Sequence, residues 1–334
     1  MSKTVMMLWA PFGDRARELS EAVGAEEISI TFLYGPRYFA PIRYVVLSIR
    51  TILLLFRRSP DVVIAQNPPI FCPLVCLLYC SLSGARLIID HHSIWKVKTL
   101  GKSPLSRAIG FLEGVVSRAA WANTTVHGVW GRMLVDIGAS RVEVIHDFVA
   151  KNPSSRNEEL RRRFSDRPTI CIASHGGHPL ERLELEAEAV AQRHDLSLLI
   201  CGPTAKLAPR IAGLKLPPNV KYVGFLDKST YETLKASVDF ALNITDEPYT
   251  LSHVIFEFAA SGIPVVSSKE EVVKELFGNS LLYADSKVER VRERVDEMSS
   301  KSEREVYAAR IRHKQEELSE LHDEELHRLK ALLS

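Results

Sequence analysis

The chain has 334 residues, which is enough for two α/β domains, and its 46% hydrophobic and 25% charged residues are ordinary for a soluble globular protein. This composition excludes a disordered chain, and a net charge of +2 is too small to favour nucleic acid as a partner. The five cysteines form no zinc pattern. Cys72, Cys76 and Cys80 recur every four residues in an apolar helix, as small buried hydrophobes do, so we expect a reducing, cytoplasmic compartment.

The chain begins with a predicted strand, Val5 to Trp9, directly after Met1 to Lys3, and no signal peptide is visible. The longest apolar stretch, Ile70 to Leu82, is shorter than the ~18 residues that a transmembrane helix needs, so it predicts a buried helix. The loop after the first strand, Ala10 to Gly13, has too few glycines for an NAD-type site. No cofactor is therefore expected.

A helix predicted within Arg37 to Arg58 is unusually apolar and carries Arg43, Arg50 and Arg57 seven residues apart, along one face. A basic row beside a broad apolar surface is typical of an interfacial helix at anionic headgroups, which predicts a peripheral membrane protein on the cytoplasmic face. The alternative is a helix that packs its apolar side on the sheet and points its arginines to water. The sequence leaves both open, with the membrane slightly favoured.

Two polar motifs follow the next strands. The strand 61–66 leads into Asn67-Pro68-Pro69, and the strand 86–90 ends in Asp90-His91-His92. A Q-N-P-P ending, an apolar helix and an I-D-x-H ending resemble the β-mannosyltransferases that act on dolichol-linked chitobiose and their archaeal relatives. The resemblance spans roughly the first 150 residues and assigns the catalytic positions to Asp90 and His92. A zinc site is the weaker alternative, because no second ligand pair at helical spacing accompanies these residues.

Asp147 ends the last predicted strand of the first half, where the same family places an Asp or Asn. It is a third catalytic candidate, and a loop-capping aspartate is an equally good interpretation. The segment 151–167, rich in Asn, Pro, Ser and charges, predicts a linker between two domains. We therefore expect an acceptor-side domain at 1–150, a donor domain at 168–310 and a C-terminal helix at 311–334.

The second half repeats the alternation of strands and helices, which predicts a parallel sheet. Its first strand, 168–173, runs into Gly176-Gly177, where backbone can approach a ligand closely, and Arg182 follows. Later strands end at Gly202 and at Phe225-Leu226.

The stretch Tyr249 to Ser268 has the strongest pattern. Small and hydroxyl residues, Thr250 and Ser252, precede an apolar helix that carries one carboxylate, Glu257, and ends at Gly262 before a β-branched strand. The first turn of such a helix presents unpaired N–H groups and the positive end of the macrodipole, which suits a phosphate. Glu257 lies further along the same helix, where a ribose diol is a natural partner.

This pattern resembles the GT-B glycosyltransferases, which use nucleotide sugars and have two Rossmann-like domains facing a cleft, with the last helix packing back on the first domain. The resemblance implies a UDP- or GDP-sugar donor whose diphosphate lies at Thr250 and Ser252 and whose ribose lies at Glu257. It also places the nucleotide base near Phe225 and Leu226. Many members have a second glutamate where this chain has Tyr249, and an Arg/Lys pair after the strand that here leads to Gly176.

The sequence therefore predicts a hexosyltransferase that needs no metal and acts on a lipid-linked saccharide or another glycan precursor. Two alternatives stay open. A nucleotide-sugar epimerase or hydrolase would turn over the donor without an acceptor, and a non-catalytic partner subunit would use a degenerate donor site. The donor base, the sugar, the acceptor, the stereochemical outcome and the oligomeric state are not encoded in any motif of the chain.

Overall fold

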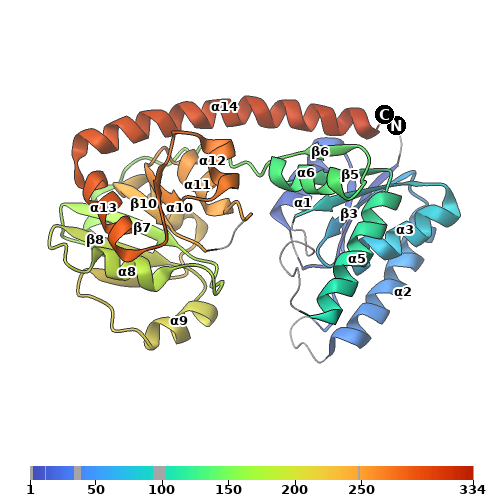
Figure 1. Ribbon diagram of the computed structural model, residues 1–334, viewed down its shortest axis with the longest axis horizontal. Helices are drawn as coiled ribbons and strands as arrows, with labels where there is room; N and C mark the ends of the chain where they lie inside the picture. Colours follow the sequence, from blue (N-terminus) through green and yellow to red (C-terminus); the bar gives the residue numbers. More distant parts are fainter. Residues whose placement is uncertain (1–2, 12, 34–38, 93–102, 247–248, 334) are drawn as a thin grey trace. The chain divides into compact units, whose positions relative to one another are not determined.

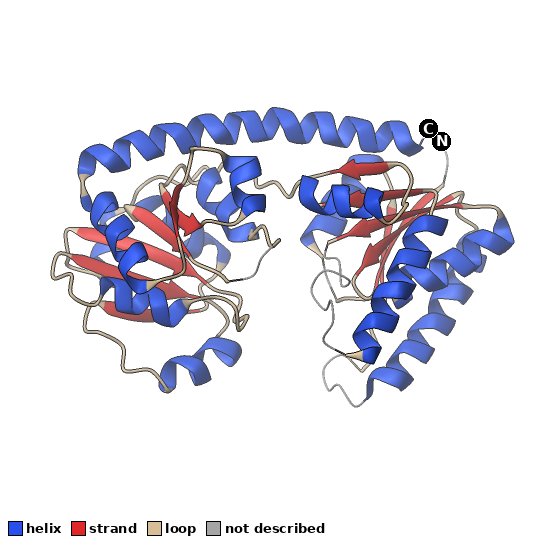
Figure 2. Cartoon of the chain, in the orientation of Figure 1, coloured by secondary structure: helices blue, strands red, loops and turns tan. Residues whose placement is uncertain are grey.

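The computed structural model describes residues 3–11, 13–33, 39–92, 103–246 and 249–333. The chain divides into two compact units. The first contains Met1–Asp147 together with Leu321–Ser334, and the second contains Phe148–Glu320. Each unit is built on a parallel sheet of six strands (Figures 1 and 2).

The first unit has the strand order β2-β1-β3-β4-β5-β6. Its strands are β1 (Thr4–Leu8), β2 (Glu26–Ser29), β3 (Val62–Asn67), β4 (Arg86–His91), β5 (Ala122–Thr125) and β6 (Val142–Val144). Its helices are α1 (Asp14–Val23), α2 (Ala40–Arg58), α3 (Phe71–Ser83), α5 (Pro104–Ala119) and α6 (Gly128–Asp136).

Both faces of this sheet are covered, because successive residues of a strand point to opposite faces. In β1, Val5 and Met7 pack with the layer formed by α2, α3 and α5 (Figure 1). Met6 and Leu8 pack on the other face, with Ala16 of α1. The strands are consequently apolar along most of their length.

The second unit has the strand order β12-β11-β10-β7-β8-β9. Its strands are β7 (Thr169–Ser174), β8 (Leu196–Cys201), β9 (Val220–Gly224), β10 (Phe240–Asn243), β11 (Val265–Ser268) and β12 (Leu282–Ala284). Its helices are α7 (Glu158–Phe164), α8 (Leu183–Val190), α9 (Thr204–Ala212), α10 (Lys228–Ser237), α11 (His253–Ala260), α12 (Glu271–Phe277) and α13 (Val288–Ser299).

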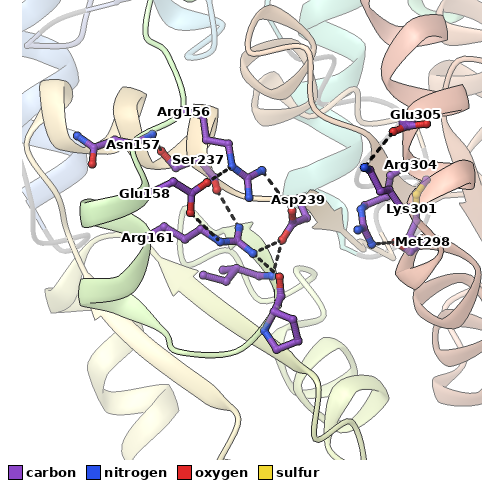
Figure 3. Close-up of polar contacts among 12 residues, drawn as sticks. Arg156, Asn157, Glu158, Arg161, Ser237, Asp239, Met298, Lys301, Arg304 and Glu305 are labelled. Carbon is purple, nitrogen blue, oxygen red and sulfur yellow. Dashed lines mark hydrogen bonds and ion pairs between the residues drawn. The ribbon is translucent and has the colours of Figure 1, made fainter.

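The segment 151–167, expected as a linker, contains α7 and belongs to the second unit. Arg161 of α7 is buried and donates from Nη2 to Asp239 Oδ2 at 2.7 Å (Figure 3). Asp239 Oδ2 also accepts the backbone N–H of Ile170 at 2.8 Å, at the start of β7. This ion pair therefore attaches α7 to the sheet, although the composition of the segment is that of a linker.

The last helix, α14 (Lys301–Leu333), returns to the first unit, as the sequence predicts. It begins two residues after α13 ends at Ser299. Near its C-terminus, Glu325 is buried and accepts from His146, and Arg86 donates to the carbonyl of Leu333 at 2.9 Å. Among the described residues, no helix is long and apolar enough to cross a membrane.

Candidate functional site

The donor-site residues predicted in the second unit lie where its strands end. β7 has β8 on one side and β10 on the other, so the direction of the chain through the sheet reverses between β7 and β10. In open α/β sheets, ligands bind at such a switch point, beyond the carboxyl ends of the strands. The loops that carry Gly176, Gly202, Phe225 and Thr250 all follow strand ends at this edge.

The N-terminus of α11 lacks the usual side-chain cap. Ser252 is the N-cap residue with extended backbone, but its hydroxyl accepts no N–H of the first turn. Instead, the Ser252 Oγ accepts Asn243 Nδ2 at 3.3 Å. Thr250 Oγ1 is buried and has no hydrogen-bond partner among the described residues. The helix start therefore has N–H donors and a hydroxyl to offer to an anion.

Glu257 is held in place through one of its two oxygens. Its Oε2 accepts the hydroxyl of Tyr231 at 2.8 Å and lies 3.5 Å from Nζ of Lys235. Lys235 is fully buried, although it is a lysine, and its ammonium also lies 2.9 Å from Glu232 Oε1. Burial and the charge of Glu257 raise the pKa of Tyr231, so the phenol remains a donor.

The other oxygen of Glu257 is less occupied. Among the described residues, its nearest ionic neighbour is His253 Nε2 at 4.0 Å. About a quarter of the side chain is exposed, 23%. An oriented and partly exposed carboxylate with one oxygen available can accept hydrogen bonds from a sugar diol.

The N–H groups of the two glycines after β7 are already bonded within the protein. The N–H groups of Gly176, Gly177 and His178 all donate to the carboxylate of Glu181, at 2.7, 2.9 and 2.9 Å. Gly177 has φ +81°, and a Cβ there would lie 2.5 Å from Cβ of Lys206. Glycine is therefore required for the turn and for the close passage of Lys206.

A buried histidine sits beneath this turn. His175 Nε2 lies 2.7 Å from Glu186 Oε2, and Glu186 is fully buried. Burial alone would lower the pKa of His175, but the charges of Glu186 and Glu181 raise it to about 9. The other Glu186 oxygen accepts the backbone N–H of Ile244 at 2.9 Å, so the pair joins the ends of β7 and β10.

Two basic side chains, Arg182 and Lys206, lie near the loop after β7, although the sequence shows no Arg/Lys pair there. Arg182 Nη1 lies 2.6 Å from Asp246 Oδ2, and both side chains are partly exposed. Lys206 is exposed and passes directly over Gly177. Gly202, with φ +151°, has no room for a side chain because a Cβ would overlap the carbonyl of His175. Phe225 is exposed and Leu226 is half-buried.

Tyr249 replaces the expected second glutamate and has an unusual backbone. Its φ is +66°, in the left-handed region that non-glycine residues rarely adopt. Such conformations cost of order 1–3 kcal/mol and cluster at ligand sites. Asp246 is paired with Arg182, and Glu247 lies outside the described residues.

In the first unit, Asp90 lies inside the protein, not at its surface. It is fully buried, and its Oδ1 accepts Arg15 Nη2 at 2.9 Å and the hydroxyl of Thr124 at 2.8 Å. Arg15 Nη1 bridges on to Asp147 Oδ1 at 3.1 Å. Burial alone would lower the pKa of Arg15, but attraction to the two carboxylates raises it above its ordinary value.

This arrangement favours a positioning role for Asp90 and Asp147 instead of the catalytic role that the resemblance implies. Both carboxylates are buried and bonded to the Arg15 guanidinium, which leaves little of either for a substrate. The three residues join α1, the end of β4 and the segment after β6.

The two adjacent histidines have opposite environments. His91 is fully buried between Asn67 Nδ2 at 3.2 Å and Asn123 Oδ1 at 3.0 Å, and burial lowers its pKa. His92 is exposed, and its backbone N–H donates to the carbonyl of Asn67 at 2.9 Å. His92 is therefore the accessible one of the pair. Within the described ranges, no three His, Cys, Asp or Glu side chains gather as a metal site would require.

Two of the three arginines predicted for membrane contact each bind one backbone carbonyl. Arg43 and Arg50 donate to the carbonyls of Leu33 and Thr31 at 3.1 and 3.3 Å. Arg57 is exposed. α2 packs on the sheet with a separate set of residues, Leu47, Thr51 and Leu55, so the sheet-facing interpretation accounts for only part of its apolar surface.

Comparison with known proteins agrees with this architecture. Residues 182–333 match the family model described as "Glycosyl transferase-like". A GDP-mannose-dependent alpha-mannosyltransferase of Mycolicibacterium smegmatis is 28% identical over 232 residues, which are 65% of this chain and 58% of that protein. The matched region thus spans little more than half the length of this relative.

Two solved structures match nearly the whole chain. HepE of Anabaena in complex with UDP-glucose has a TM-score of 0.78 at 14% identity and covers 99% of this chain and 100% of its own. Sucrose-phosphate synthase of Thermosynechococcus elongatus has a TM-score of 0.83 at 12% identity and covers 100% of this chain and 99% of its own. The two structures show that the chain has their two-domain fold, and the family model shows that residues 182–333 are similar in sequence to the proteins described as glycosyl transferase-like.

Proposed function

We propose that the protein is a hexosyltransferase that takes a sugar from a UDP- or GDP-sugar and transfers it to an acceptor hydroxyl. The observation that carries the proposal is the constellation around α11, where an uncapped helix start adjoins an oriented carboxylate, Glu257. The similarity to a GDP-mannose-dependent enzyme and to a structure holding UDP-glucose supports a nucleotide-sugar donor.

In this proposal the second unit holds the donor. The first turn of α11 and the hydroxyl of Thr250 bind the diphosphate, and Glu257 Oε1 accepts hydrogen bonds from the ribose. Lys206 and Arg182 add positive charge beside the β7 turn. The developing charge on the leaving diphosphate would be stabilised by these fixed groups, which need no reorganisation during the reaction.

The first unit holds the acceptor. His92 is the proposed catalytic group, since it is the exposed member of the motif at the end of β4. An imidazole can accept the proton of the attacking hydroxyl near neutral pH. Arg15, Asp90 and Asp147 fix the strand ends from which His92 projects.

A thermal-shift panel of UDP, GDP, ADP and the corresponding glucose and mannose derivatives tests the donor proposal. The nucleotides of one base are expected to raise the melting temperature of the second unit. A ligand at ~100 times its dissociation constant adds ~2.7 kcal/mol to the free energy of unfolding. The melting is followed by circular dichroism, since all four tryptophans lie in the first unit. A panel without any stabilising nucleotide would contradict the proposal.

We further propose that the acceptor is lipid-linked and that the first unit rests on a membrane surface. Five apolar side chains of α2 are 49–64% exposed along one stripe: Ile42, Val45, Ile49, Leu53 and Phe56. The exposed apolar side chains of the neighbouring helices are Leu78 and Leu82 of α3 and Leu105 and Phe111 of α5. An apolar surface of this extent marks an interaction site.

The charge of this helical layer favours an anionic membrane. α2 has four arginines and no acidic residue, and α3 has no charged residue. The one acid of α5, Glu113, is buried. Basic side chains beside an apolar stripe are what an interfacial helix uses to bind anionic lipid.

Co-sedimentation with vesicles tests this part of the proposal. Leu53→Glu should lower binding to vesicles containing phosphatidylglycerol by tenfold or more, because burying one leucine side chain is worth roughly 1.5–3 kcal/mol. Val135→Glu, an exposed position on α6, is the matched control and should bind as the wild type does. Equal binding of both variants, or none by the wild type, would count against a membrane-bound first unit.

A further inference from the structure

The first unit contains a cavity. Of the site residues predicted from the sequence, Arg43 is the one that lines it. Its volume is about 440 Å³, within the range of roughly 300–1,000 Å³ typical of small-molecule sites. It lies beyond the carboxyl ends of β1 and β3, beside the N-terminal part of α2. Half of its described lining residues are aromatic or proline: Trp9, Phe32, Tyr44, Pro68 and Pro69.

The aromatic walls of the cavity are fixed. Trp9 Nε1 donates to the hydroxyl of Thr51 on α2 at 2.9 Å, which sets the orientation of the indole. Tyr44 stacks on Trp9 with ring centroids 6.1 Å apart and contacts Phe71 at 4.8 Å. Trp9 is only 6% exposed, so its indole mainly supports Tyr44, and these contacts hold the shape of the cavity before any ligand binds.

Arg43 is the one charged side chain among the described residues that line the cavity. Its guanidinium lies 5.6 Å from the centroid of the Tyr44 ring and gives one hydrogen bond, from Nη1 to the carbonyl of Leu33. No carboxylate is among the described lining residues. Since a guanidinium has five N–H donors, Arg43 retains donors for an anion, and phosphate matches its planar geometry.

The surroundings of the cavity indicate how a ligand would lie. Pro68 follows Asn67, whose carbonyl accepts the backbone N–H of His92, so the proline wall adjoins the proposed catalytic histidine. On α2, the exposed apolar stripe begins at Ile42 and Val45, on either side of Arg43 and Tyr44. His92 is thus joined by a backbone hydrogen bond to the residue before Pro68, and the apolar stripe begins in the turn of α2 that carries Arg43 and Tyr44.

We propose that this cavity binds the sugar-phosphate end of a lipid-linked acceptor, with the phosphate on Arg43 and the sugar between the aromatic and proline walls. The lipid chain follows the stripe of α2. This assignment rests on the proposed function, because it names the acceptor of the same transfer.

Isothermal titration of the full-length protein with short, water-soluble probes tests the assignment. The probes are mannosyl phosphocitronellol, mannose 1-phosphate, citronellyl phosphate and citronellol. Mannosyl phosphocitronellol should bind at least tenfold more tightly than mannose 1-phosphate or citronellyl phosphate. Arg43→Gln, whose amide can still donate to Leu33, should weaken it by tenfold or more, because a hydrogen bond to a charged group is lost.

Two further variants make the result specific. Arg17→Gln removes the same charge from an exposed position on α1 and should leave probe binding unchanged. Ala10→Leu places extra volume in the cavity wall and should also abolish binding. Tryptophan fluorescence confirms that each variant of the first unit is folded.

Equal losses in Arg43→Gln and Arg17→Gln would overturn the assignment, as would wild-type strength in Ala10→Leu. Mannose 1-phosphate binding as tightly as the full probe would overturn the lipid-linked acceptor. Nucleotide binding is measured on the same samples. Intact nucleotide binding without any probe binding would overturn the cavity assignment alone, whereas failure of the donor panel would count against the proposed function.

Discussion

Replacing Asp90 by Asn is expected to lower the free energy of unfolding of the first unit by about 3 kcal/mol, near the lower end of the 3–5 kcal/mol range for breaking a buried ion pair. Arg15 is buried, and the substitution leaves it with Asp147 as its remaining carboxylate contact. Urea unfolding followed by tryptophan fluorescence measures this effect selectively, since all four tryptophans lie in residues 1–147.

The double variant Arg15→Gln with Asp90→Asn should recover part of the loss, because the buried guanidinium that lost Asp90 is then removed. The recovery stays partial, since Asp147 loses its contact with Arg15. Glu21→Gln, at an exposed position of α1, is the control and should stay within about 0.5 kcal/mol of the wild type. If Asp90→Asn also stayed within that limit, the ion pairs of Arg15 with Asp90 and Asp147 would not hold the strand ends in place, and the positioning role would be wrong.

Replacing Glu257 by Gln is expected to weaken binding of the donor nucleotide by about 10- to 100-fold. The neutral amide cannot accept charge-assisted hydrogen bonds from the ribose, each worth about 1.5–3 kcal/mol. The amide also removes a negative charge 3.5 Å from the buried ammonium of Lys235, which keeps Glu232 as its partner. Isothermal titration with the nucleotide identified by thermal shift gives the dissociation constants.

Glu188→Gln is the matched control for Glu257→Gln, because Glu188 is exposed on α8 of the same unit. It should bind the nucleotide as the wild type does. Circular dichroism shows whether both variants remain folded. A folded Glu257→Gln variant that binds within threefold of the wild type would remove Glu257 from the donor site.

The architecture could be predicted because each local signal agreed with the tertiary structure. The stretch from Thr250 to Ser268 is the clearest case. Gly262 has φ +66°, which few other residues adopt, and it lies two residues after the end of α11, where the pattern places the helix stop. Alternating strands and helices likewise predicted two parallel sheets, and both are present.

The partners of the predicted residues could not be found from local patterns. Arg15 lies 75 residues from Asp90 and 132 from Asp147, and nothing in its helix distinguishes it from an exposed arginine. Tyr231 and Lys235 are one helical turn apart on α10, and only the fold brings that turn to Glu257.

In the turn after β7, the sequence pattern does not reveal which group the backbone N–H groups bind. Two glycines after a strand predict close backbone approach to a ligand, but the chain supplies its own carboxylate, Glu181, for the N–H groups. Sequence also showed no basic pair there. Lys206 comes from the next strand–helix unit and reaches the turn only because Gly177 has no side chain.

Transfer of a labelled sugar is the measurement that tests the central claim most directly. The protein is incubated with radiolabelled GDP-mannose or UDP-glucose and a lipid extract containing polyprenyl-phosphate-linked saccharides, and the label in the organic phase is counted. We expect label to enter the organic phase with the wild type for one donor and, at a donor concentration below saturation, to fall by about 10- to 100-fold with Glu257→Gln. Donors that remain intact, or label released only as free sugar in water, would contradict a glycosyltransferase acting on a lipid-linked acceptor.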